Sequence, residues 1–172
     1  VNKANHGREA QSIKVYERGQ RLHLATIVSY LENLNQFERD SNKYEERRNR
    51  IYELASKTQG RGDALFKVST GRDAFEKEGE HHSQKDSWSV TPTGYFTPQF
   101  FEVKHKSESY SNSLCDSWLA KGIGFLARKE FCTMMENAIF FNGPIALHKA
   151  IPGTEPELGV KASGGCVRLP AA

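Results

Sequence analysis

The sequence contains few cysteines and no long apolar run, and its charges nearly balance. Its 172 residues carry 24 Lys and Arg against 21 Asp and Glu, a net charge of +3. A surplus this small and dispersed argues against nucleic-acid binding, which usually needs a clustered basic face. Because no apolar stretch approaches the roughly 18 residues of a membrane-spanning helix, we expect no membrane span in this chain.

The start of the chain lacks an initiator Met and has no sign of a secretory signal. Val1-Asn2-Lys3 opens without a charged segment followed by an apolar one. We therefore expect a precursor segment or an engineered boundary upstream, and a soluble globular chain here. Hydrophobic residues make up 37% and charged residues 26%, which is sufficient for a packed core in one domain.

The three cysteines, Cys115, Cys132 and Cys166, neither require nor exclude an oxidising compartment. No C-x-x-C spacing is present, and the pair His81-His82 has no thiol nearby. A structural zinc site is therefore not expected, and the histidine pair is assigned to a polar loop.

The first third of the chain changes from a strand pattern to a helix pattern. Ile13 and Val15 alternate with polar residues before a turn at 18–20, which predicts a hairpin over 12–28. Aromatic and aliphatic residues then recur every seven positions: Tyr30, Phe37, Tyr44 and Ile51. This spacing predicts a helix or helical pair over 29–58. Its apolar stripe either docks on the domain, which we favour, or binds a partner.

The rest of the chain shows short apolar segments separated by turns. Strands are predicted at 64–70, in one or two segments within 96–103, at 138–141 and at 145–147. Turns are expected at Thr91-Pro92-Thr93-Gly94 and at Asn142-Gly143. The charged residues 72–87 are expected to form a loop with at most one helical turn, and 118–135 a helix.

The residues best suited to chemistry lie near the end of the chain. Cys166 follows two glycines, which let a backbone approach a substrate closely and point its N–H groups at a developing oxyanion. His148 ends a predicted strand and could supply the base that a nucleophilic cysteine needs. Arg168 shares one strand face with Cys166, where it could lower the thiol pKa or hold a carboxylate. From the residues alone, an inert buried cysteine remains the competing interpretation.

The segment from Phe140 to Leu169 resembles the signature of the L,D-transpeptidase (YkuD-like) catalytic domain. That signature is a His after an apolar strand, then Ser, His or Gly, Gly, Cys, Ile or Val, and Arg or Asn. The matching residues are His148, Ser163, Gly164, Gly165, Cys166, Val167 and Arg168. Leu158-Gly159, Val68-Ser69-Thr70-Gly71 and Thr91-Pro92-Thr93-Gly94-Tyr95-Phe96 agree in order.

The resemblance implies an α+β fold with a mainly β core, a mixed β-sandwich with helical insertions. Residues 1–172 would form a single catalytic domain, with a helical insertion at about 29–58 and a lid at about 105–133. Lys149 stands where the family often has Gly, and relatives usually continue beyond the position of Ala172 with a helix and a strand. The C-terminal end of the fold is therefore expected to be truncated.

The resemblance also implies a reaction. Cys166 would attack a peptidoglycan stem peptide, release D-Ala and leave a thioester, which a second stem resolves to a 3–3 cross-link. His148 would act as base and acid, and backbone N–H groups near Gly165 and Cys166 as the oxyanion hole. Ser163, Gly164 and Arg168 would shape the site, and neither a metal nor an organic cofactor is needed.

Three other interpretations remain open. Water could resolve the same thioester, which would make the protein an L,D-carboxypeptidase or an amidase. The protein could also be a non-catalytic wall-binding module, or an unrelated cytosolic domain. A wall substrate implies the periplasm or cell envelope. There Cys115 and Cys132, 17 positions apart in the expected lid, either form a disulfide or stay separate buried thiols.

Overall fold

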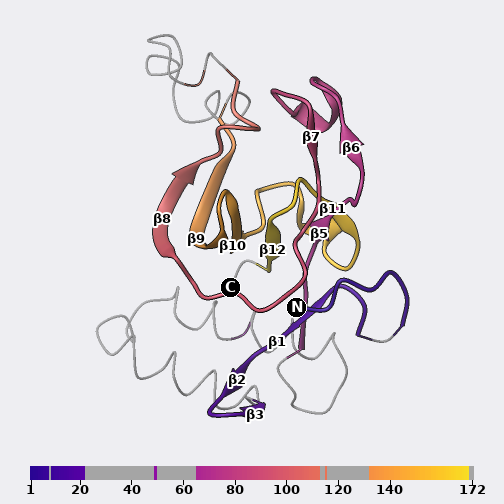
Figure 1. Ribbon diagram of the computed structural model, residues 1–172, viewed down its shortest axis with the longest axis vertical. Helices are drawn as coiled ribbons and strands as arrows, with labels where there is room; N and C mark the ends of the chain where they lie inside the picture. The colour runs from indigo at the N-terminus through magenta and orange to yellow at the C-terminus, as the bar shows by residue number, and fades with distance from the viewer. Residues whose placement is uncertain (8, 22–48, 50–64, 113–114, 116–131, 171–172) are drawn as a thin grey trace.

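The computed structural model describes residues 1–7, 9–21, 49, 65–112, 115 and 132–170, and these residues are mostly β-structure. Figure 1 shows a curved sheet on one side of the molecule and several two-stranded pairs beside and below it. The strands are β1 (Ser12–Lys14), β2 (Tyr16–Glu17), β3 (Gln20–Arg21), β4 (Leu65–Lys67), β5 (Thr70–Gly71), β6 (Phe75–Glu76), β7 (Ser87–Trp88), β8 (Phe100–Lys106), β9 (Met134–Asn142), β10 (Ile145–Lys149), β11 (Lys161–Ser163) and β12 (Val167–Leu169).

The largest sheet has four strands in the order β12-β10-β9-β8. Strands β8, β9 and β10 are antiparallel neighbours, and β9 and β10 are joined by a tight turn at Gly143, where φ is +54°. Strand β12 instead runs parallel to β10, with Leu147 beside Val167 and His148 beside Arg168. This parallel pairing brings the two ends of the sequence signature together.

One face of this sheet carries the described core. Met135, Ala138, Phe140 and Ala146 are buried together, and Cys166 packs against them. The ring of Phe140 stacks on Phe100 of β8 at a centroid distance of 4.3 Å. The alternation of buried and less buried positions along β10 is what a strand with one packed face requires.

Further short strands lie beside this sheet and contact it through β12. Strand β11 pairs in parallel with β5, and β1 pairs antiparallel with β4. Between β4 and β5, Ser69 forms a bridge to Arg168 of β12, with hydrogen bonds of 3.1 and 2.9 Å between their backbones. One strand is predicted over 64–70 and expected to end before Gly71, but the described residues form two short strands, β4 and β5, and Gly71 belongs to the second.

The segment expected as a loop over 72–87 contains a hairpin, which corrects that prediction. Strands β6 and β7 pair antiparallel, with Phe75 opposite Trp88 and their rings edge-to-face at 5.5 Å. The anticipated helical turn is the 3-10 helix η1 (Glu80–His82), in which His81 and His82 are exposed. Two-residue strands are too short to show an alternating pattern, so the charged composition concealed the hairpin.

Other expectations are confirmed in part where the structure describes the chain. Within the hairpin predicted over 12–28, a tight turn at Arg18-Gly19 joins β2 to β3, but β1 pairs with β4 instead. Strand β8 overlaps the segment predicted within 96–103, and β9 and β10 contain the strands predicted at 138–141 and 145–147. Met134 and Met135, expected to end a helix, begin β9 instead, because they pair with Lys106 and His105 of β8.

The expected helical parts are only partly tested. Residues 22–48, 50–64 and 116–131, which hold most of the predicted helical segments, lie outside the described residues. The lid expected over 105–133 stays a prediction, and its first two residues, His105 and Lys106, belong to β8. The 3-10 helix η3 (Glu155–Glu157) lies between β10 and β11. Within the described part of the chain, no helix is long and apolar enough to cross a membrane.

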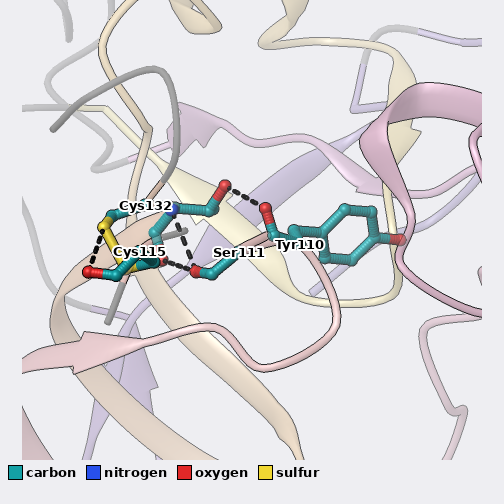
Figure 2. Close-up of a disulfide and its surroundings, with 5 residues drawn as sticks. Tyr110, Ser111, Cys115 and Cys132 are labelled. Carbon is teal, nitrogen blue, oxygen red and sulfur yellow. Dashed lines mark hydrogen bonds between the residues drawn. A yellow bond between two sulfur atoms is a disulfide. The ribbon is translucent and has the colours of Figure 1, made fainter. Parts of the chain in front are cut away.

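Cys115 and Cys132 form a disulfide, which decides between the two alternatives left open by the sequence. Their Cα atoms are 5.0 Å apart. The bridge closes the segment between β8 and β9 at its base, and Figure 2 shows Tyr110 and Ser111 beside it.

Reduction of this disulfide should lower the free energy of unfolding. For a separation of 17 residues, the chain-entropy estimate is about 3 kcal/mol. Urea unfolding with and without a phosphine reductant measures the change. A Cys115→Ala/Cys132→Ala variant is the control, because reductant should not affect it. Equal stability of the oxidised and reduced wild-type protein would contradict a bridge that constrains this segment.

Candidate active site

Strand β11 ends at Ser163, and Gly164, Gly165 and Cys166 connect it to β12. We refer to residues 163–166, which hold the candidate nucleophile, as the nucleophile loop. The Ser163 hydroxyl donates to the carbonyl of Cys166 at 2.5 Å and accepts the N–H of Gly165 at 3.1 Å. This hydroxyl therefore closes the turn that presents Cys166. Because the Gly165 N–H is occupied, the N–H of Cys166 is the better candidate for an oxyanion donor.

Gly165 adopts a backbone conformation that other residues rarely reach. Its φ is +127°, and a Cβ at this position would lie 2.9 Å from Cδ1 of Ile145 and 3.1 Å from the carbonyl oxygen of Val90. Both the left-handed φ and the close neighbours require glycine here. The second glycine of the motif thus brings the nucleophile loop against β10 and against the segment that follows β7.

The Cys166 thiol lies beside the first half of β10. The backbone N–H of Ala146 points at its sulfur at 3.4 Å, and the sulfur of Met135 is 3.9 Å away. The residue is partly exposed. Burial raises the pKa of the Cys166 thiol, and this effect outweighs the Ala146 N–H and the Arg168 charge, which both lower it. The resting group is a neutral thiol that needs a base to become a nucleophile.

His148 is buried on β10, with only 2% of its surface exposed. Its Nδ1 lies 2.7 Å from the carbonyl oxygen of Lys149, which can only accept, so Nδ1 carries the proton and Nε2 is left as an acceptor. Burial lowers the pKa of His148 from 6.5 to about 4. The Arg168 charge also lowers this pKa, whereas the hydrogen bond to Lys149 raises it. The imidazole is therefore neutral at pH 7 and able to take a proton.

His148 is predicted to end a strand, but it lies within β10 and is buried. Strand β10 continues to Lys149, and Ala146 and His148 both point to its buried face. An alanine at position 148 would leave a cavity and remove the donor to Lys149. A substitution that keeps the size and the donor is therefore the better probe of its chemistry.

The pairing of β10 with β12 brings Cys166, the residue directly before β12, beside the strand that carries His148. The backbone N–H of Ala146 reaches the Cys166 sulfur, and Ala146 and His148, two residues apart, share the buried face of β10. Within the described residues, no hydrogen bond joins the thiol to the imidazole. Catalytic hydrogen bonds are often long before substrate binds, so this arrangement remains compatible with proton transfer.

Arg168 is held by an acidic partner. Its Nη1 contacts Oε2 of Glu157, at the end of η3. Its charge opposes protonation of His148 and favours the thiolate of Cys166, but burial is the larger influence on the pKa of each. The role of Arg168 toward a substrate stays a prediction.

Thr91 is a supporting residue that the sequence marked only as part of a turn. Its hydroxyl donates to the carbonyl of Gly165 at 2.6 Å and accepts the N–H of Gly71 at 2.8 Å. The residue is 3% exposed, so both bonds are shielded from water. Thr91 thereby ties two of the weaker matching motifs to the nucleophile loop.

A Thr91→Val variant should lose stability because it leaves two buried backbone groups without a partner. Each unsatisfied group costs about 1–3 kcal/mol. Urea unfolding measures the loss, and Thr93→Val, at an exposed position of the same segment, is the matched control. A Thr91→Val protein as stable as the control would show that the bridge contributes nothing.

Within the described residues, no group of three or more His, Cys, Asp or Glu side chains is arranged to hold a metal ion. The site consists instead of a thiol, an imidazole, a guanidinium and backbone N–H groups. Such a set can carry out nucleophilic acyl transfer, with a cysteine as nucleophile and a neutral histidine as base.

Three solved structures resemble the chain at low identity. They are an L,D-transpeptidase from Xylanimonas cellulosilytica DSM 15894 (17% identity, 62% of this chain, 38% of that chain, TM-score 0.39), the L,D-transpeptidase from Mycobacterium smegmatis (20%, 64%, 41%, 0.38) and L,D-transpeptidase 3 from Mycobacterium tuberculosis (21%, 63%, 36%, 0.36). The chain spans about two fifths of the length of these proteins. No curated protein matches it.

A comparison with protein families gives a more extensive match. The L,D-transpeptidase catalytic domain, YkuD, matches residues 46–172, which is well over half of the chain. The matched region includes β10 with His148 and the whole loop that presents Cys166. The chain therefore belongs to the L,D-transpeptidase catalytic domain family.

Proposed function

We propose that the chain is a cysteine acyltransferase that acts on peptidoglycan stem peptides, with Cys166 as nucleophile and His148 as general base. The observation that carries the proposal is the pairing of β10 with β12, which brings the Cys166 thiol beside the strand that carries a neutral, oriented imidazole. Membership of the L,D-transpeptidase family supports peptidoglycan as the substrate.

The first half of the proposed reaction forms an acyl-enzyme. The sulfur of Cys166 attacks the carbonyl carbon between the third residue, a diamino acid, and the terminal D-Ala. The thiol proton passes to Nε2 of His148, and the N–H of Cys166 donates to the oxyanion. The carbon–nitrogen bond then breaks, the proton on His148 moves to the amine of D-Ala, and a thioester remains.

The second half resolves the thioester. The side-chain amine of a diamino acid in another stem attacks the acyl carbon and gives its proton to His148. The sulfur leaves and regains a proton, so that the enzyme is restored and a 3–3 cross-link is formed. Gly164, Gly165 and Ser163 shape the loop, and Arg168 adds positive charge beside it. The proposal requires neither a metal nor an organic cofactor.

The electrostatics of the site support proton transfer during the attack rather than a preformed ion pair. Burial raises the pKa of Cys166 and lowers that of His148, so both groups are neutral at rest. General-base transfer of this kind is worth about 100- to 10,000-fold in rate.

Cys166 should react with iodoacetamide only at higher pH than a short peptide that carries the same cysteine. The reason is the raised pKa of its thiol, while Cys115 and Cys132 are protected as a disulfide. Mass mapping under non-reducing conditions identifies the labelled residue, and its rate is followed against pH. A midpoint below that of the peptide, or labelling at Cys115 or Cys132, would contradict the assignment.

The experiment that tests the function is incubation with disaccharide-tetrapeptides, followed by analysis of the products. Release of D-Ala with 3–3 dimers supports the transpeptidase. Tripeptides without dimers would identify the L,D-carboxypeptidase alternative, and release of a wall-linked protein the amidase. Binding to the wall without any product would identify a non-catalytic module.

The same proposal places the protein in the periplasm or cell envelope, where its substrate is found. It also treats residues 1–172 as one catalytic domain, with the segment 29–58 as a helical insertion. Fractionation of the native cells, with detection of the protein by antibody in the cytoplasm, periplasm and envelope, tests the location.

A further inference from the structure

We propose that Tyr110 is a positioning residue for the nucleophile: its phenol ring packs on Gly164 and fixes the turn that presents Cys166. The inference rests on the proposed role of Cys166 and adds a residue that the sequence signature does not contain. Tyr110 lies 54 positions before Gly164 and follows the end of β8.

The first observation is the space beside Gly164. A Cβ on this residue would overlap the hydroxyl oxygen of Tyr110 and lie 2.6 Å from its ring carbon Cε2. Unlike Gly165, Gly164 has no positive φ, so its backbone conformation alone does not demand glycine. Glycine is needed at position 164 because the phenol ring occupies the space of a side chain.

The second observation is that the far end of the ring is anchored. The Tyr110 hydroxyl donates to Oε2 of Glu76 at 3.2 Å, and Oε1 of this carboxylate accepts from Nη1 of Arg72 at 2.5 Å. Burial opposes ionisation of Glu76, but the Ser89 hydroxyl and the Arg72 guanidinium hold its pKa below the ordinary value. The backbone N–H of Arg72 in turn donates to the carbonyl of Ser163 at 3.1 Å. The same network therefore holds Tyr110 and the first residue of the nucleophile loop.

The third observation concerns the backbone of Tyr110. Its carbonyl accepts the hydroxyl of Thr133 at 2.8 Å, and the N–H of Thr133 donates to the Ser111 hydroxyl at 3.1 Å. Thr133 follows Cys132, so the disulfide lies directly behind these bonds. Figure 2 shows the Tyr110 ring pointing away from the disulfide, with its hydroxyl at the far end. One end of Tyr110 is thus fixed by the disulfide-closed segment and the other by Glu76.

These contacts explain how a residue outside the motif affects the nucleophile. The loop has two successive glycines, and Gly164 has no side chain with which to fix its own position. The ring of Tyr110 supplies the missing packing surface one residue before Gly165. Without it, the Cys166 sulfur and N–H would sample positions away from the attacking geometry, and misplacement by about 1 Å can cost about 100-fold in rate.

A double-mutant cycle between Tyr110 and Gly164 tests the inference. Tyr110→Leu and Gly164→Ala should each lower kcat for D-Ala release by about 100-fold with little change in KM. In the Tyr110→Leu background, Gly164→Ala should add much less, because the space is then free. Tyr110→Phe should restore most of the rate, since its ring still packs on Gly164. Tyr16→Leu, at an exposed position on β2, is the matched control.

The pH midpoint of Cys166 alkylation is measured on the same variants. We expect Tyr110→Leu and Gly164→Ala to shift it toward that of a free cysteine, and Tyr110→Phe to leave it in place. The alkylation midpoint is measured without peptidoglycan, so it tests the role of Tyr110 even if neither the wild type nor any variant releases D-Ala. Absence of D-Ala release would count against the proposed function and not against the role of Tyr110. Equal effects of Gly164→Ala in both backgrounds, or a wild-type midpoint in Tyr110→Leu, would overturn the inference.

Discussion

Cys166→Ala should abolish the release of D-Ala from a tetrapeptide muropeptide and leave the fold intact. Cys166 carries the only thiol of the nucleophile loop, and the Ser163 hydroxyl is already bonded to the loop backbone, so removal of the thiol should end covalent chemistry. Loss of a nucleophile typically costs about 10⁶-fold in kcat. The change deletes one sulfur from a partly exposed residue, so the stability cost should stay near 1 kcal/mol.

Cys166→Ser serves as the matched control for this variant. Serine keeps a hydrogen-bonding atom near the N–H of Ala146, so packing is preserved, but its hydroxyl is a much weaker nucleophile than a thiol at neutral pH. Both variants should be inactive with melting temperatures close to the wild-type value. D-Ala release from either one at more than a small fraction of the wild-type rate would remove Cys166 from the mechanism.

The second large effect is expected for His148→Gln. Its side chain is close to the imidazole in size and remains polar, so the site stays filled while the proton acceptor Nε2 is lost. Turnover should fall by about 100- to 10,000-fold. His148→Ala, which also creates a cavity at a buried position, should lose the same activity and unfold at lower temperature. A Gln variant with wild-type turnover would exclude His148 as the base.

The pKa of His148 gives this residue a signature in the pH profile. Burial lowers that pKa from 6.5 to about 4, so kcat/KM should fall only as the pH approaches 4. The unfolded chain takes up this proton near pH 6.5, so the folded state loses stability as the pH falls from about 6.5 to about 4. His148→Gln should lack this part of the acid destabilisation. An acid limb near 6.5 would show that His148 is not buried as the structure describes.

Features with a local signal were predictable from the sequence. The turn at Asn142-Gly143 and the apolar residues around it predicted the hairpin of β9 and β10. The hairpin prediction succeeded because turn chemistry and strand alternation act over a few neighbouring residues. The glycines before Cys166 predict room for a substrate, but the space beside Gly165 is filled by Ile145 and Val90, contacts that the local sequence does not reveal.

Features that depend on distant packing were missed. The burial of His148 follows from its place two residues after Ala146, on the packed face, but the sequence does not reveal which face of β10 is covered. The contact of Tyr110 with Gly164 joins positions far apart, and no local pattern marks it. Strands β6 and β7 are held by one aromatic pair and are too short for an alternating pattern.

The measurement that most directly tests the central claim is intact-protein mass spectrometry during turnover of a disaccharide-tetrapeptide. We expect a transient increase in mass equal to the mass of the substrate minus that of D-Ala. Hydroxylamine should remove the adduct, as expected of a thioester, and digestion should map it to Cys166. The increase should be absent in Cys166→Ala and should form far more slowly in His148→Gln. Release of D-Ala with no covalent adduct under rapid quenching, or an adduct on another residue, would contradict covalent catalysis by Cys166.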